Sequence, residues 1–165
     1  MKHYHHLVNQ VEEITVVIKQ YVLDRFEREY NLLIELPGVS AIIACVILSE
    51  IGPNVEAFQS QGNLASWAGV CPGSYESAGI KKSSHTTQGN KYLKSSLFQA
   101  GGTAGRSKDE AFHSLYTRIS SRSSKMKAII AYAHKMIRII YKILSAGEHY
   151  DTKKALGLRQ QARAN

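Results

Sequence analysis

Apolar residues recur at helical spacing along most of this 165-residue chain. Near the amino terminus they stand at intervals of 4, 3, 4 and 3, which places Leu7, Val11, Ile14, Ile18 and Tyr21 in one stripe along a helix. The spacing predicts a long amphipathic helix within residues 1–31. An exposed apolar stripe needs a cover, and either the body of the domain or a second helix would supply it.

The segment of residues 32–52 predicts two helices joined by a tight Pro-Gly turn. Ser40 suits the N-cap of the second helix, because its hydroxyl can accept a hydrogen bond from a free backbone N–H in the first turn. Ile42 and Val46 mark the face of this helix that we expect to be buried.

The turn between these helices gives the segment the pattern of a helix-hairpin-helix. In such a motif the turn and the helix amino terminus offer backbone N–H groups to a DNA phosphate without reading the bases. Pro37, Gly38 and Val39 are therefore candidate DNA-binding residues. An ordinary helical hairpin has the same pattern, and no Lys or Arg stands beside this turn to decide between the two.

Helical spacing continues through the carboxy-terminal half of the chain. Ser107 and Glu110 form a capping-box pattern, and a long apolar stripe over residues 126–144 predicts a further helix that ends at Gly147. The sequence thus predicts an all-α fold containing the helix-hairpin-helix-like element. The expected parts are the amphipathic helix of residues 1–31, a helical domain of residues 32–151 and a basic tail of residues 152–165.

The charge of the chain is divided unevenly. Residues 1–70 carry four Lys or Arg against eight Asp or Glu, and residues 71–165 carry 17 against five, so the net charges are −4 and +12. A basic half of this kind favours contact with a polyanion, although a merely basic surface gives the same arithmetic. Two cysteines without zinc spacing predict free thiols, and no apolar run reaches the roughly 20 residues that span a bilayer. We expect a cytoplasmic protein without a membrane partner.

The segment of residues 69–94 places one serine between flexible backbone and a group of cations. Ala78 and Gly79 follow Ser77 and allow close approach of a partner, and the first cations come directly after them. A second turn then leads into a helix that begins with a polar and basic sequence. The candidate DNA-binding residues of this segment are Lys81, Lys82, Asn90, Lys91 and Lys94.

Phosphoryl transfer by a serine has two chemical requirements. Cations must stabilise charge on the phosphate oxygens, and a base or metal must take the hydroxyl proton. The lysines meet the first requirement for Ser77, but nothing adjacent clearly meets the second. Glu76 would point to the other side of a strand, and His85 is the only imidazole nearby. Alternative nucleophiles are Ser74, Tyr75 and Tyr92, although the arginines and histidines that surround the nucleophile of a tyrosine recombinase are not found here.

Several short motifs in this order resemble the carboxy-terminal transposase domain of the insertion sequence 110/116/902 family. They are Leu36-Pro37-Gly38-Val39, Pro72-Gly73, Glu76-Ser77-Ala78-Gly79 and Gly89-Asn90-Lys91-Tyr92-Leu93-Lys94. The resemblance covers the chain from about Leu32 to Asp151. It implies a nucleic-acid-guided recombinase for DNA transposition in which the serine matching Ser77 is the catalytic residue that attacks DNA.

The resemblance also implies partners that this chain does not contain. Magnesium would be held by acidic residues of a separate amino-terminal nuclease-like domain, so we expect no cofactor or metal ligand here. Expected partners are DNA, a guide RNA, and either further copies of the chain or a full-length transposase. On this interpretation the isolated chain binds DNA but is catalytically incompetent. The alternatives are a non-catalytic helix-hairpin-helix DNA-binding module and a dimerisation module.

Overall fold

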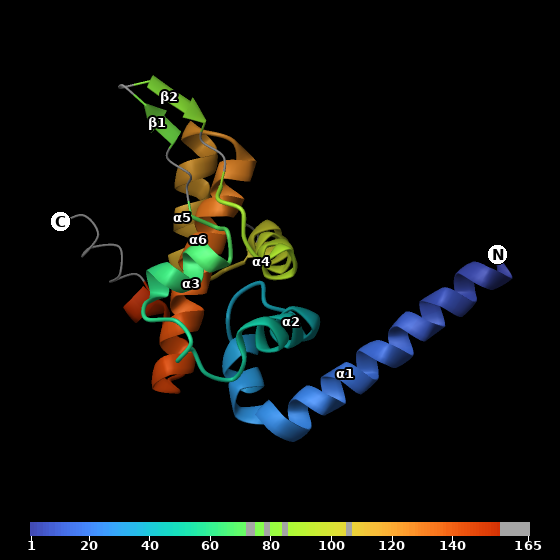
Figure 1. The fold of residues 1–165 in the computed structure, drawn as a ribbon. Coiled ribbons are helices and arrows are strands. Elements are labelled where there is room, and N and C mark those ends of the chain that lie inside the picture. The colour runs from blue at the N-terminus through green and yellow to red at the C-terminus, as the bar shows by residue number, and fades with distance from the viewer. Residues whose placement is uncertain (72–74, 78–79, 84–85, 105–106, 156–165) are drawn as a thin grey trace.

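A computed structural model describes residues 1–71, 75–77, 80–83, 86–104 and 107–155, and for 75–77 and 80–83 it describes the backbone. The architecture is helical, which confirms the all-α prediction, with one addition: a short antiparallel hairpin lies between α3 and α4 (Figure 1). The elements are α1 (Lys2–Ile34), α2 (Ala41–Ile51), α3 (Gln61–Trp67), β1 (Tyr75–Ser77), β2 (Ile80–Ser83), α4 (Lys91–Ala104), α5 (Glu110–Arg122) and α6 (Lys125–Ala146).

Helix α1 is divided by a kink at Phe26, where φ is −137° and ψ is 34°. After the kink, Tyr30 and Leu33 are buried in the domain. Before it, the helix projects away from the body (Figure 1), and the five residues of the predicted stripe over residues 7–21 are between 47% and 64% exposed. The body of the domain therefore does not cover this stripe.

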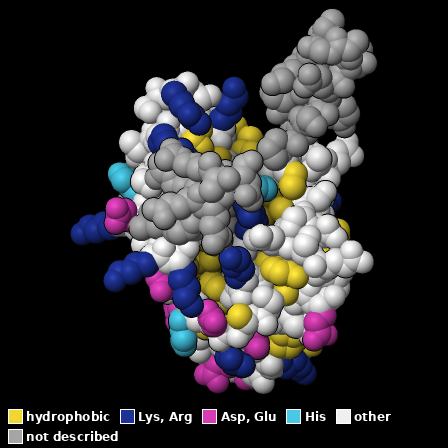
Figure 2. All heavy atoms as spheres, turned by 90° about the vertical axis from the view of Figure 1, so that its left-hand side faces the viewer, with side chains coloured by type: hydrophobic (Ala, Val, Ile, Leu, Met, Phe, Trp, Pro, Cys, Tyr) yellow, Lys and Arg dark blue, Asp and Glu magenta, His cyan; other side chains and the backbone are white. Residues whose placement is uncertain are grey.

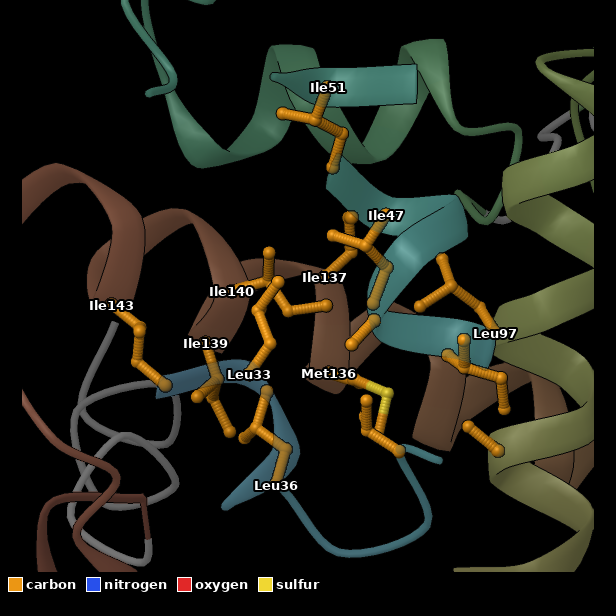
Figure 3. Close-up of a cluster of buried hydrophobic side chains, with 14 of the residues drawn as sticks. Leu33, Leu36, Ile47, Ile51, Leu97, Met136, Ile137, Ile139, Ile140 and Ile143 are labelled. Carbon is orange, nitrogen blue, oxygen red and sulfur yellow. The ribbon is translucent and has the colours of Figure 1, made fainter. Parts of the chain in front are cut away.

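The core is built around α6, which packs against α3, α4 and α5 and also contacts α1. Met136 and Ile140 of α6 are fully buried in a cluster with Leu33 of α1, Ile47 of α2 and Leu97 of α4 (Figure 3). Burying one such side chain contributes about 1.5–3 kcal/mol. Helix α6 thus fixes the positions of α3 and α4, and the hairpin lies between these two helices in the chain.

The predicted start of α2 is confirmed, but its predicted buried face is wrong. The Ser40 hydroxyl accepts a hydrogen bond from the backbone N–H of Ile43 at 3.3 Å. The buried side chains include Ile43 and Ile47, whereas Ile42 is 60% exposed. Nearly every position of this helix is apolar, so spacing alone does not select a face. Packing against α1 and α4 selects it.

The boundaries of the last two helices follow their caps. Asp109 caps α5 by accepting a hydrogen bond from the backbone N–H of Phe112 at 3.1 Å, so the cap lies two residues after the predicted Ser107. Gly147 ends α6 with φ of 64°, as predicted. Among the described helices, none is long and apolar enough to cross a membrane.

Candidate nucleic-acid interface

The predicted catalytic serine lies at the end of the first strand of the hairpin. Strands β1 and β2 are antiparallel, with Ser77 paired to Ile80 and Glu76 paired to Lys81. The hairpin stands at one end of the molecule, beyond α3 and α4 (Figure 1). The backbone register therefore brings Ser77 and the predicted phosphate-binding Lys81 and Lys82 into one small element. Pro72, Gly73, Ser74, Ala78, Gly79 and His85 lie outside the described residues.

The base of the hairpin is a contact between two glycines. Gly69 has φ of +70°, a conformation that favours glycine, and its backbone lies directly against Gly89. A Cβ on Gly89 would stand 2.3 Å from the Gly69 nitrogen and 2.5 Å from the Trp67 carbonyl oxygen. Residues 87–90 also donate two hydrogen bonds to residues 67–71, from Thr87 N–H to the Cys71 carbonyl at 3.2 Å and from Asn90 N–H to the Trp67 carbonyl at 3.0 Å. We call this contact of residues 67–71 with residues 87–90 the hairpin clamp.

Asn90 joins the hairpin clamp to two helices. Its Oδ1 accepts hydrogen bonds from the backbone N–H groups of Tyr92 at 3.0 Å and Leu93 at 2.9 Å, which caps the start of α4. Its Nδ2 donates to a carboxylate oxygen of Glu50 on α2. Both ends of the amide are thus used inside the protein, and the DNA contact predicted for Asn90 stays a prediction.

The two lysines of α4 have different surroundings. The half-buried Lys94 donates from Nζ to the Thr87 carbonyl at 3.0 Å and so ties the hairpin clamp to α4. Lys91 is exposed, and its ammonium lies 4.8 Å from the ring centre of the exposed Tyr92. Lys91 is therefore available to a phosphate. Lys94 would have to give up its hydrogen bond to Thr87 before its ammonium could bind a phosphate.

Exchanging the partners of the Glu50–Asn90 hydrogen bond tests the positioning role of this pair. Asn90→Asp keeps an N-cap but sets two carboxylates against each other, so we expect about 1–3 kcal/mol of destabilisation from the lost bond and the repulsion. Adding Glu50→Gln supplies an amide donor to the new carboxylate and is expected to restore most of this loss. Chemical denaturation of both single variants and the double variant measures the coupling; additive effects would contradict it.

The turn predicted to contact DNA packs inside the domain. Tyr132 is fully buried, and its hydroxyl donates a hydrogen bond to the Pro37 carbonyl. Gly38 has φ of +84°, and a Cβ there would stand 2.6 Å from the Ala100 carbonyl oxygen of α4. Val39 donates its backbone N–H to the Leu36 carbonyl at 3.0 Å and is itself buried. These contacts give the turn a role in joining α2 to α4 and α6, and its predicted phosphate contact is untested.

The described residues do not assemble a metal centre or an activated thiol. No group of three or more His, Cys, Asp and Glu side chains in the described part of the chain is placed to hold a metal ion. Burial raises the pKa of the Cys71 thiol, which favours its unreactive protonated form. The expectation that acidic residues of a separate domain hold magnesium near Ser77 stays a prediction.

Ser77 and its lysines were predicted from the sequence and stay predictions, whereas the residues that hold the base of the hairpin were not predicted. Glu50 sits in an apolar helix 40 positions before its partner Asn90, and no local pattern links the two. Gly69 and Gly89 carried a signal, since a glycine stands at each end of the hairpin segment. Glycines at such positions indicate a close backbone approach.

Comparison with known proteins assigns the class and the family. A model of the transposase family IS116/IS110/IS902 matches residues 30–117. The chain is 31% identical over 127 residues to a pilin gene-inverting protein of Moraxella bovis, covering 74% of this chain and 39% of that protein. It is 27% identical over 133 residues to an IS110 insertion-element protein of Streptomyces coelicolor, covering 79% of this chain and 32% of that protein.

The matches are thus with a transposase family, a gene-inverting protein and an insertion-element protein. The chain belongs to the IS116/IS110/IS902 transposase family. It spans about two fifths or less of the length of the curated relatives named here.

Proposed function

We propose that this chain is the DNA-binding and strand-transfer part of an insertion-sequence transposase, with Ser77 as its nucleophile. The proposal rests on the position of Ser77 in the fold. Ser77 is the last residue of β1, and the Gly69–Gly89 contact closes the base of the hairpin. Membership of a transposase family and the net charge of +12 after residue 70 support DNA as the partner. Such attack requires the nucleophile to be held in a near-attack geometry.

In the proposed reaction the Ser77 oxygen attacks a DNA phosphorus atom. A bond forms between them, the bond from phosphorus to a deoxyribose oxygen breaks, and the released strand end carries a hydroxyl. The reverse attack by a strand-end hydroxyl restores the serine and joins the exchanged strands. Lys81, Lys82 and Lys91 stabilise charge on the phosphate oxygens. A base or metal in a separate acidic domain is proposed to accept the serine proton, because no residue adjacent to Ser77 in the sequence is a clear base for it.

The proposed partners of the chain are DNA, a guide RNA and additional protein. The uncovered stripe of α1 supports a protein partner, since the five stripe residues are about half exposed in this fold. A helix of a further copy or of a full-length transposase would cover the stripe. DNA binding, which does not depend on Ser77, does not require this protein partner.

Neutralising the three lysines assigned to phosphate binding tests the DNA contact. In the triple variant Lys81→Gln, Lys82→Gln and Lys91→Gln, we expect the slope of log affinity against log salt to flatten by about 2.7, at about 0.9 per lost contact with duplex DNA. Binding of a fluorescent duplex across a salt series measures the slope. Lys2→Gln, Lys19→Gln and Lys153→Gln remove the same charge elsewhere and serve as the control. Equal slopes in the two triple variants would remove the phosphate contacts from the proposal.

A further inference from the structure

We infer that the corner between α5 and α6 is a second binding surface for a nucleic-acid backbone, in addition to the hairpin. The α5–α6 corner is defined by Arg122, Lys125 and Lys127. This inference deepens the proposed function and rests on it, because the phosphodiester chain at the corner is taken to be part of the same nucleic-acid assembly that reaches Ser77.

The cations of the α5–α6 corner have no visible role inside the protein. All three residues are exposed. No hydrogen bond from their side chains and no ion pair is found among the described residues, and the backbone N–H of Lys127 is the donor to the capping Ser124 hydroxyl. Exposed cations held close together on adjoining helices repel one another, and a polyanion relieves this repulsion.

Two other cations of α6, Lys135 and Arg138, have contacts inside the protein. Lys135 donates from Nζ to the Ala111 carbonyl at 2.8 Å and lies 4.9 Å from the ring centre of Phe112. Arg138 donates to the side chain of Gln61 on α3 at 3.2 Å. These two residues join α6 to its neighbours, so fold stability accounts for their charge. It does not account for the charge at the corner.

The sequence around the corner contains no opposing charge. Between Glu110 and Glu148 there is no Asp or Glu, and this stretch of 37 residues carries seven Lys or Arg. The corner also includes the amino terminus of α6, a helix of 22 residues, whose dipole adds positive potential at the same place. An anion approaching the corner therefore meets attraction from side chains and helix, and this stretch of the chain holds no carboxylate to oppose it.

The corner is placed to share one nucleic acid with the hairpin. The hairpin and the connection between α5 and α6 stand at the same end of the molecule (Figure 1). A space-filling view shows Lys and Arg side chains at this end, and others over the middle and lower part of the same face (Figure 2). Nucleic-acid phosphates repeat every few ångströms along a strand, so one backbone can contact both surfaces. The corner would then hold the nucleic acid while the hairpin presents Ser77.

The test neutralises the corner in the full chain. The variant Arg122→Gln, Lys125→Gln and Lys127→Gln is compared with wild type and with the triple variant of Lys2, Lys19 and Lys153 described above. Binding to a DNA duplex of about 30 base pairs and to a single-stranded RNA of about 30 nucleotides is measured across a salt series. We expect the corner variant to flatten the slope by about 2.7 with the duplex, or by about 2.1 with the single strand. A flattened slope with one probe and an unchanged slope with the other identifies the nucleic acid at the corner.

The inference would be overturned if, with both probes, the corner variant and the control triple variant had equal slopes of log affinity against log salt. Because the substituted side chains are exposed, the melting temperature should stay within about 2 °C of wild type, which excludes unfolding as the cause of a loss. The result is separable from the proposed function. If the corner variant flattens the slope and the triple variant of Lys81, Lys82 and Lys91 does not, the corner is supported and the phosphate contacts of those three lysines are removed. If only the triple variant of Lys81, Lys82 and Lys91 flattens the slope, the corner alone is removed.

Discussion

Replacing Ser77 by alanine is expected to abolish formation of a covalent protein–DNA adduct while leaving DNA affinity within about twofold of wild type. Alanine removes the attacking oxygen but none of the cations assigned to phosphate binding. We expect the rate of adduct formation to fall by at least about 10³-fold, as when an activated nucleophile is lost from an enzyme. The assay combines this chain with an acidic nuclease-like domain, magnesium, guide RNA and nicked DNA, and separates the adduct on a denaturing gel.

The controls for this experiment distinguish the serine from its neighbours. Ser83→Ala changes a serine of the paired strand β2 and is expected to leave the adduct intact. Ser74→Ala and Tyr92→Phe examine the alternative nucleophiles in the same way. An adduct that persists in Ser77→Ala and disappears in one of these variants would reassign the nucleophile. An active full-length transposase in parallel shows that the assay conditions support the chemistry.

Substituting Gly89 by alanine is expected to be the most destabilising single change at the hairpin clamp. The new Cβ would meet the backbone of Gly69 and Trp67 at 2.3–2.5 Å, and backbone atoms cannot rotate away as a side chain can. Forced overpacking of this kind costs about 1–3 kcal/mol. Urea denaturation measures the loss of free energy of unfolding. We also expect adduct formation to fall more than DNA affinity, because the hairpin must shift relative to α4.

Gly102→Ala is the matched control for the same substitution. Gly102 is exposed within α4, and a Cβ there has nothing within 4 Å. Alanine has a better helix propensity than glycine, so this variant should gain about 0.8–1 kcal/mol at most. Equal effects of Gly89→Ala and Gly102→Ala would show that the Gly69–Gly89 contact does not determine stability.

Features that depend on neighbouring residues could be predicted from the sequence. Ser40 caps α2 and Gly147 ends α6 because a cap acts within one turn of the backbone it satisfies. The predicted cap of α5 was two residues early, because Asp109 and Ser107 are both suitable side chains and only one can stand at the first turn. Helix content followed from the spacing of apolar residues.

Features that depend on distant contacts could not be predicted in the same way. The kink at Phe26 turns the stripe of α1 away from the body. The sequence of α1 contains no proline or glycine from which this kink could be predicted. The pairing of Glu50 with Asn90 and the contact of Gly69 with Gly89 join residues 40 and 20 positions apart, and both depend on how α2, α3 and α4 pack. Ser77 could be proposed from its flanking motif, but the contacts that hold the base of its hairpin could not be predicted from the sequence.

Peptide mapping of the trapped adduct tests the central claim most directly. The adduct is formed with wild-type chain, digested with protease and nuclease, and sequenced by mass spectrometry to locate the residue that carries the nucleotide. We expect the nucleotide on the Ser77 hydroxyl. A nucleotide on any other side chain, in an assembly that exchanges strands, would contradict it.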